Sequence, residues 1–312
     1  MSYLSPSILL LTYAYTLVGM LTGYLLAGLL NELGITDYLM KSLSSTLGRV
    51  IHPVLTPTLV LYVVSPRSAH AHASSCLRRG LVTPKDIYLV MMVSGLPLRL
   101  LYLYRIYVPV LIPLLGTVAL QYLGIKLVLD SLLASVAITY GLKKYSVRTH
   151  LPHGVVSGDL RLSKASLIKG VEEGLRDLLK FLPKYSLAYA LASVMIVTGL
   201  TSLIANSLKP TLTPLGITSL GLTYVTASVI SPRAAVGIAK LMVTTHHYVS
   251  EVLATMLIGN AFYVVLNELW TKILPLYLST YPRRVATNLL LIKVVTPVAY
   301  SLVVATSLLI TH

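Results

Sequence analysis

The sequence is short of the residues from which water-soluble and secreted proteins are built. Charged residues make up only 11% of the 312-residue chain, whereas a soluble domain carries about 25%. The single cysteine, Cys76, cannot form a disulfide within the chain and gives no redox evidence of an extracellular domain. Because 55% of the residues are apolar and the mean hydropathy is +0.80, these shortages exclude a disordered chain, a disulfide scaffold and an ordinary cytosolic enzyme.

Acidic residues are scarce as well. Ten Asp and Glu stand against 25 Lys and Arg, which gives a net charge of +15. On a soluble protein this excess would indicate nucleic acid, but membrane proteins collect Lys and Arg in their cytoplasmic loops. Nine of the basic residues lie in segment 143–184. Membrane topology therefore accounts for most of the charge, and we expect no nucleic-acid partner.

The familiar local motifs of catalytic and nucleotide-binding sites are missing. The sequence contains no Walker A loop and no GxGxxG, GxSxG or HExxH motif. His70 and His72 are two residues apart, which places them on different faces of a helix, and no His/Glu cluster has a recognised metal-binding spacing. We therefore expect no catalytic residues, no metal site and no cofactor.

Long apolar segments are what the sequence has in abundance. A helix needs about 20 mostly apolar residues to cross a bilayer. The segments that meet this requirement are 8–30, 87–107, 120–142, 185–205, 248–270 and 285–310. Two shorter apolar runs, 50–64 and 216–230, each end in Ser-Pro-Arg. Such runs favour half-helices that line a cavity or are covered by protein, because lipid cannot satisfy open backbone groups.

The basic segment 143–184 contains an amphipathic pattern. Between residues 163 and 182 the apolar residues recur every three or four positions, and Lys and Arg occupy much of the remaining surface. This pattern predicts a helix that lies along the cytoplasmic headgroups, with anionic lipid as a partner. A solvated, charged linker is compatible with the same residues. In both interpretations the segment is cytoplasmic.

An internal repeat divides the chain. A shift of 166 residues aligns Ser65-Pro66-Arg67 with Ser231-Pro232-Arg233, and six of the 11 residues between 63 and 73 are identical. The predicted domains are a first membrane repeat (1–142), a basic linker (143–184) and a second membrane repeat (185–312). Three full spans per half would insert the two halves in opposite orientations. The predicted fold is an all-α, polytopic protein of the cell membrane, built from two inverted-topology repeats with half-helices. Its N-terminus and an uncharged loop at 108–119 are predicted to lie outside.

The Ser-Pro-Arg elements predict the start of a helix in each half. Serine is a preferred N-cap, and proline is favoured at the first helical position. If both helices begin at mid-membrane, their positive N-termini converge and suit an anionic or strongly polar ligand. An intramembrane arginine is costly enough to indicate function, although each arginine could instead pair with a carboxylate or a carbonyl of the other half. The predicted substrate-binding residues are Ser65, Pro66, Arg67, Ser231, Pro232, Arg233, Ser94 and Asn260.

Other polar residues inside the predicted spans allow several interpretations. Ser94 aligns with Asn260 under the shift of 166, so the two could line one cavity or make hydrogen bonds between packed helices. Asp130 follows Lys126 by four residues, a spacing that permits an ion pair on one helix face. Glu251 and Glu268 could pair with Arg67 or Arg233, or could carry protons in a coupled transporter.

One stretch resembles a known family. Gly170-Val-Glu-Glu-Gly174-Leu-Arg-Asp-Leu-Leu-Lys-Phe-Leu-Pro183, directly before a predicted span, looks like the opening of the Gate (nucleoside-recognition) domain family. Each half of the chain, with its Ser-Pro-Arg and following small-residue helix, is similar to one such domain. Related Gate domains occur in concentrative nucleoside transporters, in the membrane part of the bacterial ferrous-iron transporter, and in spore-maturation membrane proteins.

The chain also departs from these relatives. It has no GTPase domain, and Ser65 and Ser231 precede the two prolines where a cysteine could handle a soft metal. It is shorter than a concentrative nucleoside transporter and lacks acidic and amide motifs for ribose recognition. The family name therefore does not assign a nucleoside as the substrate.

Two functions follow from these observations. The first is a transporter or permease for a polar or anionic small solute, in which the halves rock against each other around Arg67 and Arg233. The alternative is a non-transport membrane scaffold or assembly factor, whose basic linker binds a cytoplasmic partner or anionic lipid. A third class, an enzyme acting on a lipid phosphate, would need converging acid and base residues that the sequence does not offer. The predicted partners are the bilayer and an unidentified small-molecule substrate, with homo-oligomerisation left open.

Overall fold

The computed structural model describes residues 51–144, 163–198, 213–230, 232–245 and 248–310, together with Pro210 and scattered positions between 10 and 33. Every regular element in these segments is a helix, which confirms the all-α class. Most of the predicted span 8–30 and residues 145–162 of the linker lie outside the described residues.

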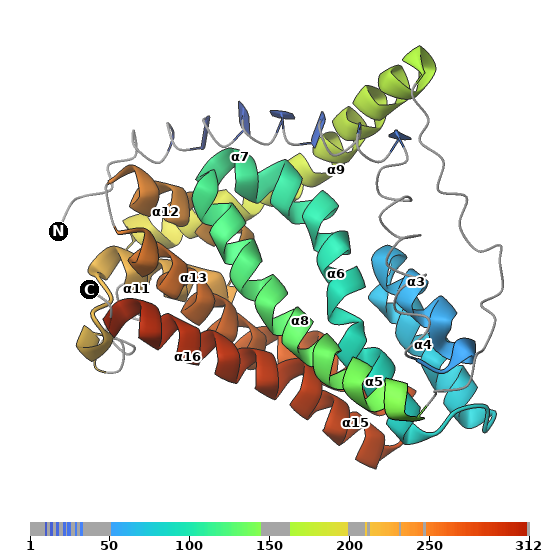
Figure 1. Ribbon diagram of the computed structural model, residues 1–312. Helices are drawn as coiled ribbons and strands as arrows, with labels where there is room; N and C mark the ends of the chain where they lie inside the picture. Colours follow the sequence, from blue (N-terminus) through green and yellow to red (C-terminus); the bar gives the residue numbers. More distant parts are fainter. Residues whose placement is uncertain are drawn as a thin grey trace.

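In the first half, a pair of short helices precedes a long helical hairpin (Figure 1). The elements are η1 (Pro53–Leu55), α3 (Thr56–Val64), α4 (Pro66–Arg78), α5 (Pro84–Val93), α6 (Gly95–Tyr102), η2 (Leu103–Leu111), α7 (Ile112–Leu115) and α8 (Thr117–Lys144). Both η1 and the later η3 are single 3-10 turns, whereas η2 and the later η4 and η5 are π-helical.

The second half repeats this order after one long helix. Its elements are α9 (Lys164–Val197), η3 (Thr213–Leu215), α11 (Ser219–Ile230), α12 (Pro232–Thr244), α13 (Val249–Tyr263), η4 (Val264–Ile273), α14 (Leu274–Thr280), α15 (Arg283–Leu290), η5 (Leu291–Val295) and α16 (Thr296–Ile310). The helix pairs α3–α4 and α11–α12 both break at a Ser-Pro step. The predicted helix starts at Pro66 and Pro232 are therefore confirmed.

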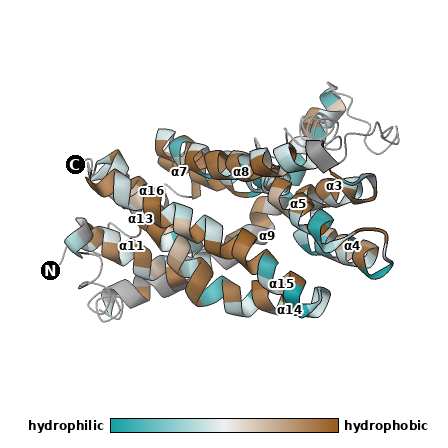
Figure 2. Ribbon diagram, turned by 60° about the horizontal axis from the view of Figure 1, so that its bottom comes forward, coloured by the Kyte–Doolittle hydropathy of each residue, from teal (hydrophilic) through white to brown (hydrophobic). Residues whose placement is uncertain are grey.

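Four described helices are long and apolar enough to cross a membrane. They are Pro84–Leu115, Thr117–Gly141, Val249–Thr280 and Arg283–Ile310. These helices match the predicted spans 87–107, 120–142, 248–270 and 285–310. The chain is therefore a multi-pass membrane protein. Figure 2 shows hydrophobic residues along most of α8, α13 and α16.

The prediction of a loop at 108–119 is wrong. The helix that begins at Pro84 continues through η2 and α7 as far as Leu115, so only a tight turn remains. The wide turns of a π-helix leave room for Pro109, which has no N–H to donate. The chain reverses at Gly116, whose φ of 56° lies in the left-handed region that favours glycine.

The amphipathic pattern of the linker belongs to a single long helix. Helix α9 runs from Lys164 to Val197 and contains Pro183, so the boundary predicted between residues 184 and 185 falls inside a helix. The predicted span 185–205 begins in this helix and ends outside the described residues. Gly174 lies against the backbone of Tyr24, where an added Cβ would collide. Helix α9 therefore packs closely against the N-terminal segment at this point.

The bounds of the helices follow the repeat. Helix α4 covers 66–78 and α12 covers 232–244, a shift of 166 at both ends. Helix α8 covers 117–144, and α15 to α16 together cover 283–310, again shifted by 166 at both ends. Figure 1 shows that α8 and the α15–α16 helix run in opposite directions.

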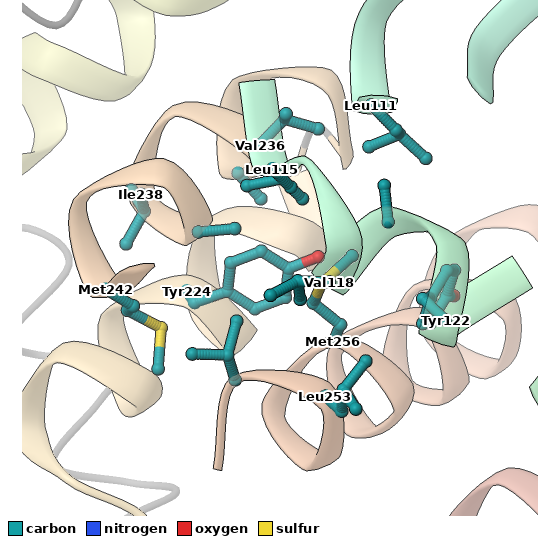
Figure 3. Packing of buried hydrophobic residues seen from close by; sticks show 14 of the residues in the cluster. Leu111, Leu115, Val118, Tyr122, Tyr224, Val236, Ile238, Met242, Leu253 and Met256 are labelled. Carbon is teal, nitrogen blue, oxygen red and sulfur yellow. The ribbon is translucent and has the colours of Figure 1, made fainter. Parts of the chain in front are cut away.

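Among the described residues, buried apolar side chains form two clusters, and each combines residues of both halves. In the first cluster, η2, α7 and α8 pack against α11, α12 and α13 (Figure 3). In the second, α3, α4 and α5 pack against α14 and α15. Helix α12 contacts α7 in the first cluster, and α4 contacts α14 in the second. The two contacts occupy corresponding places in the repeat.

Candidate functional site

Each of the two Ser-Pro-Arg elements leads into a short helix, α4 in the first half and α12 in the second. Helix α4 lies on one side of α6 and α8, and α12 lies on the other (Figure 1). Ser65 and Pro66 are partly buried and Arg67 is exposed, whereas Pro232 is partly buried. Ser231 and the side chain of Arg233 fall outside the described residues.

Ser94 and Asn260 have different surroundings. Ser94 is fully buried between α5 and α6, and its hydroxyl donates to the carbonyl of Met91 at 2.8 Å. Asn260 is partly buried on α13. The bond within the helix favours a packing role for Ser94.

An ion pair between the partly buried Arg99 and the buried Asp130 joins α6 to α8. The Arg99 Nε donates to the Asp130 Oδ2 at 2.8 Å, so Asp130 pairs across two helices and not with Lys126 of its own helix. The other carboxylate oxygen lies against Gly95, where an added Cβ would approach it to 2.6 Å. Glycine at this position therefore allows the backbone of α6 to lie close to the Asp130 carboxylate.

Two lysines lie near this pair. Lys126 is only 5% exposed, and its Nζ donates to the Ser301 hydroxyl of α16 at 2.8 Å. Lys293, on η5, is partly buried, and its Nζ lies 5.8 Å from the centre of the Tyr62 ring. The negative charge of Asp130 attracts both ammonium groups, and the positive charge of Arg99 repels them.

We call Arg99, Lys126, Asp130 and Lys293 the central charge cluster. Its three cations and one anion give a formal charge of 3 − 1 = +2. All four residues belong to helices long enough to span a membrane, where ionisable residues are rare and mark functional sites. Sequence reasoning missed Arg99 and Lys293, although each is a charge inside a predicted span.

A second polar cluster lies between α4 and the α14–α15 turn. His70, which is 4% exposed, has a tyrosine hydroxyl at each ring nitrogen. Its Nε2 lies 3.0 Å from the Tyr62 hydroxyl, and its Nδ1 lies 3.0 Å from the Tyr281 hydroxyl. The Tyr277 ring packs on the imidazole with the ring centres 5.0 Å apart. Burial, with a smaller effect of Tyr277, raises the pKa of Tyr281 well above its usual value, so this hydroxyl is protonated.

The acidic residues Glu251 and Glu268 each have a partner within the second half. The Glu268 carboxylate lies 3.6 Å from the Lys272 ammonium, one turn along the same helix. The backbone N–H of Thr218 donates to the Glu251 carboxylate at 3.3 Å. Within the described segments, no three His, Cys, Asp or Glu side chains gather as metal ligands.

Comparison of the chain with family models, with curated proteins and with solved structures found no match, so the resemblance to Gate domains stays a prediction.

Proposed function

We propose that this protein is a membrane transporter for a small polar or anionic solute. The observation that carries the proposal is the excess positive charge of the central charge cluster inside spanning helices. Desolvated cations without enough counter-charge are costly in a membrane. A bound anion would supply the missing negative charge, and the ammonium groups would supply its hydrogen-bond donors.

The position of the cluster supports the same function. Lys126 of α8 bonds to Ser301 of α16, and the neighbouring Tyr300 hydroxyl donates to the Ile125 carbonyl at 3.1 Å. The first and second halves of the repeat therefore touch beside the cluster. In transporters built from repeats, the substrate binds where the repeats meet, and one repeat moves against the other.

The proposal includes an inverted arrangement of the two halves. The equal shifts of the helix bounds and the opposite directions of α8 and α15–α16 support it. In this arrangement the half-helix pairs α3–α4 and α11–α12 are related elements on opposite sides of the cluster. They would move with their own halves, while the cluster holds the solute.

The test is uptake by purified protein in liposomes, with phosphate, sulfate and succinate as labelled probes. Lys126→Met and Lys293→Met keep the length of the side chain and remove one charge each. We expect either variant to lower uptake at least tenfold. Lys169→Met is the matched control, because Lys169 is exposed on α9, and it should transport like wild type.

Two outcomes bear on the site. Wild-type uptake by both Lys126→Met and Lys293→Met would contradict a role for the central charge cluster. Arg67→Ala and Arg233→Ala, tested in parallel, would move the site to the half-helices if they alone abolished uptake. Folding of each variant is checked by gel filtration in detergent.

Helix α9 favours a second candidate, a membrane scaffold or assembly factor. It exposes apolar and basic residues together, namely Leu167, Ile168, Val171, Leu175 and Leu179 with Lys164, Lys169 and Arg176. Such a helix suits a surface with anionic lipid headgroups. Replacing the three basic residues by Gln would abolish this function while leaving solute uptake unchanged.

A further inference from the structure

The polar cluster between α4 and the α14–α15 turn has two complete hydrogen-bond arrangements. In the first, the Tyr62 hydroxyl donates to the Met91 Sδ at 2.7 Å and accepts from the His70 Nε2–H. The His70 Nδ1 then accepts a hydrogen bond from the Tyr281 hydroxyl. Every donor in this arrangement has an acceptor, and the imidazole is neutral.

The second arrangement reverses both hydrogen bonds of the imidazole. The Tyr62 hydroxyl donates to Nε2, the Nδ1–H donates to the Tyr281 oxygen, and the Tyr281 hydroxyl donates to the His70 carbonyl, which lies 3.2 Å away. All donors again have acceptors. The two arrangements differ by the tautomer of one buried histidine, which is the property of a group that passes protons.

Packing alone does not require these side chains. Under the shift of 166, His70 corresponds to Val236, while Tyr277 and Tyr281 correspond to Leu111 and Leu115. These three residues lie in the apolar cluster between α7 and α12 (Figure 3). The same contact between helices is therefore built from apolar residues in one place and from a histidine with tyrosines in the other.

We infer that Tyr281, His70 and Tyr62 form a proton relay between the α14–α15 turn and Lys293, and that the protein couples solute movement to protons. The turn beside Tyr281 exposes Pro282, Arg283 and Arg284. At the other end, the Lys293 ammonium lies over the Tyr62 ring. The coupling rests on the proposed function, whereas the relay itself can be measured without a solute.

One proton passes in a balanced set of steps. Tyr281 gives its proton to Nδ1 of His70 and takes a new proton from the side of the turn. Nε2 gives its proton to the Tyr62 oxygen, and Tyr62 gives its own to a water that passes a proton on to the neutral amine of Lys293, because the Lys293 Nζ lies over the Tyr62 ring, 5.8 Å from its centre, and not at the hydroxyl. One proton enters, one arrives at Lys293, and the cluster changes from the first arrangement to the second. Both hydroxyls and the imidazole must then reorient before the cluster can pass another proton.

The groups that face His70 come from every packed element. They are Tyr62 of α3, Tyr277 of α14, Tyr281 after α14, and Lys293 of η5, whose charge acts on the imidazole. A protonated Lys293 completes the positive charge of the central charge cluster and so favours a bound anion. Proton arrival and anion binding therefore support each other.

The test is proton flux into liposomes that contain the full chain and a trapped pH dye. A potassium diffusion potential drives the flux in a potassium HEPES buffer that contains none of the three anion probes. We expect wild-type flux well above that of protein-free liposomes, and at least a tenfold loss in Tyr281→Phe. Tyr277→Phe is the matched control, because Tyr277 touches the same imidazole through its ring, and its flux should equal that of wild type.

Tyr62→Phe removes the hydroxyl at the other side of His70 and should reproduce the loss, so the relay can be tested even if Tyr281→Phe fails to fold. Wild-type flux in both variants would overturn the relay, as would equal losses in Tyr281→Phe and Tyr277→Phe, or no flux in wild type. Anion uptake that needs Lys126 but not Tyr281 would keep the proposed function and overturn the coupling of solute movement to protons. Proton flux that needs Tyr281, in a protein that takes up no anion, would keep the relay and overturn the proposed function.

Discussion

The contact between α4 and the α14–α15 turn differs from its counterpart between α12 and the α7–α8 turn in chemistry but not in place. The two are related by the shift of 166 residues, and each joins the short helix pair of one half to the hairpin of the other half. Val236 and Leu115 meet in one contact, where His70 and Tyr281 meet in the other. Burial of apolar area is enough to hold the first.

The comparison teaches that the polar version does more than hold two helices together. A buried polar group costs free energy unless it is fully hydrogen-bonded. An apolar solution to the same packing problem exists within the same molecule, so the histidine and tyrosines represent an additional requirement. Proton transfer is a requirement that these groups meet and that Val236 and Leu115 cannot.

The charges inside the spanning helices are divided in the same unequal way. Arg99 and Asp130 correspond to Val265 and Thr296 of the second half. Three of the four members of the central charge cluster belong to the first half, and only Lys293 comes from the second. The two halves therefore share their order of helices, whereas most of the central charge cluster belongs to the first half.

Asp130→Ala should have the largest effect on stability. It leaves the Arg99 guanidinium buried without its partner, and breaking a buried pair costs about 3–5 kcal/mol. The free energy of unfolding, measured by denaturant titration in detergent, should fall by about this amount.

The second half supplies the matched variant for this test. Arg99→Val with Asp130→Thr introduces the residues found at the corresponding positions, so neither member of the Arg99–Asp130 pair is left without the other. Its free energy of unfolding should return to within about 1 kcal/mol of wild type, while anion uptake is lost. A double variant as unstable as Asp130→Ala would show that the ion pair is needed for folding.

Gly95→Ala should have an intermediate effect. The new Cβ would lie 2.6 Å from the Asp130 Oδ1, so the carboxylate must move away from Arg99. Such overpacking costs about 1–3 kcal/mol. The second half tolerates alanine at the corresponding position, Ala261, because Thr296 stands there in place of Asp130. Gly124→Ala is the control, since nothing lies within 4 Å of its added Cβ, and it should not lower the melting temperature.

Much of the fold could be predicted from local signals. Long apolar runs identified the four described spans, and the Ser-Pro steps marked the starts of α4 and α12. The prediction of a loop at 108–119 is wrong because a π-helix continues through Pro109. The pattern of apolar residues does not distinguish a π-helix from the end of a helix.

The site depended on contacts that no local pattern contains. The spacing of Lys126 and Asp130 indicated an ion pair within one helix, whereas Asp130 pairs with Arg99, 31 residues away. His70 and Tyr281 are 211 residues apart, and only the packing of one half on the other brings them together. Arg67 and Arg233, which the repeat indicates, occupy corresponding positions in the two halves. The residues of the central charge cluster have no charged counterparts at the corresponding positions.

His70→Val should have the smallest effect, and it addresses the comparison most directly. Tyr281 can still donate to the backbone carbonyl at position 70, and Tyr62 can still donate to Met91. The loss of stability should therefore be about 1 kcal/mol. Adding Tyr281→Leu copies the apolar contact of the other half and should recover most of this loss, because replacing both polar partners by apolar groups is nearly neutral. Thermal unfolding in detergent measures the recovery, and proton flux should be absent from both variants. A double variant less stable than His70→Val would mean that the polar contact is needed to hold α4 in place, and the two contacts would then differ in packing as well as in chemistry.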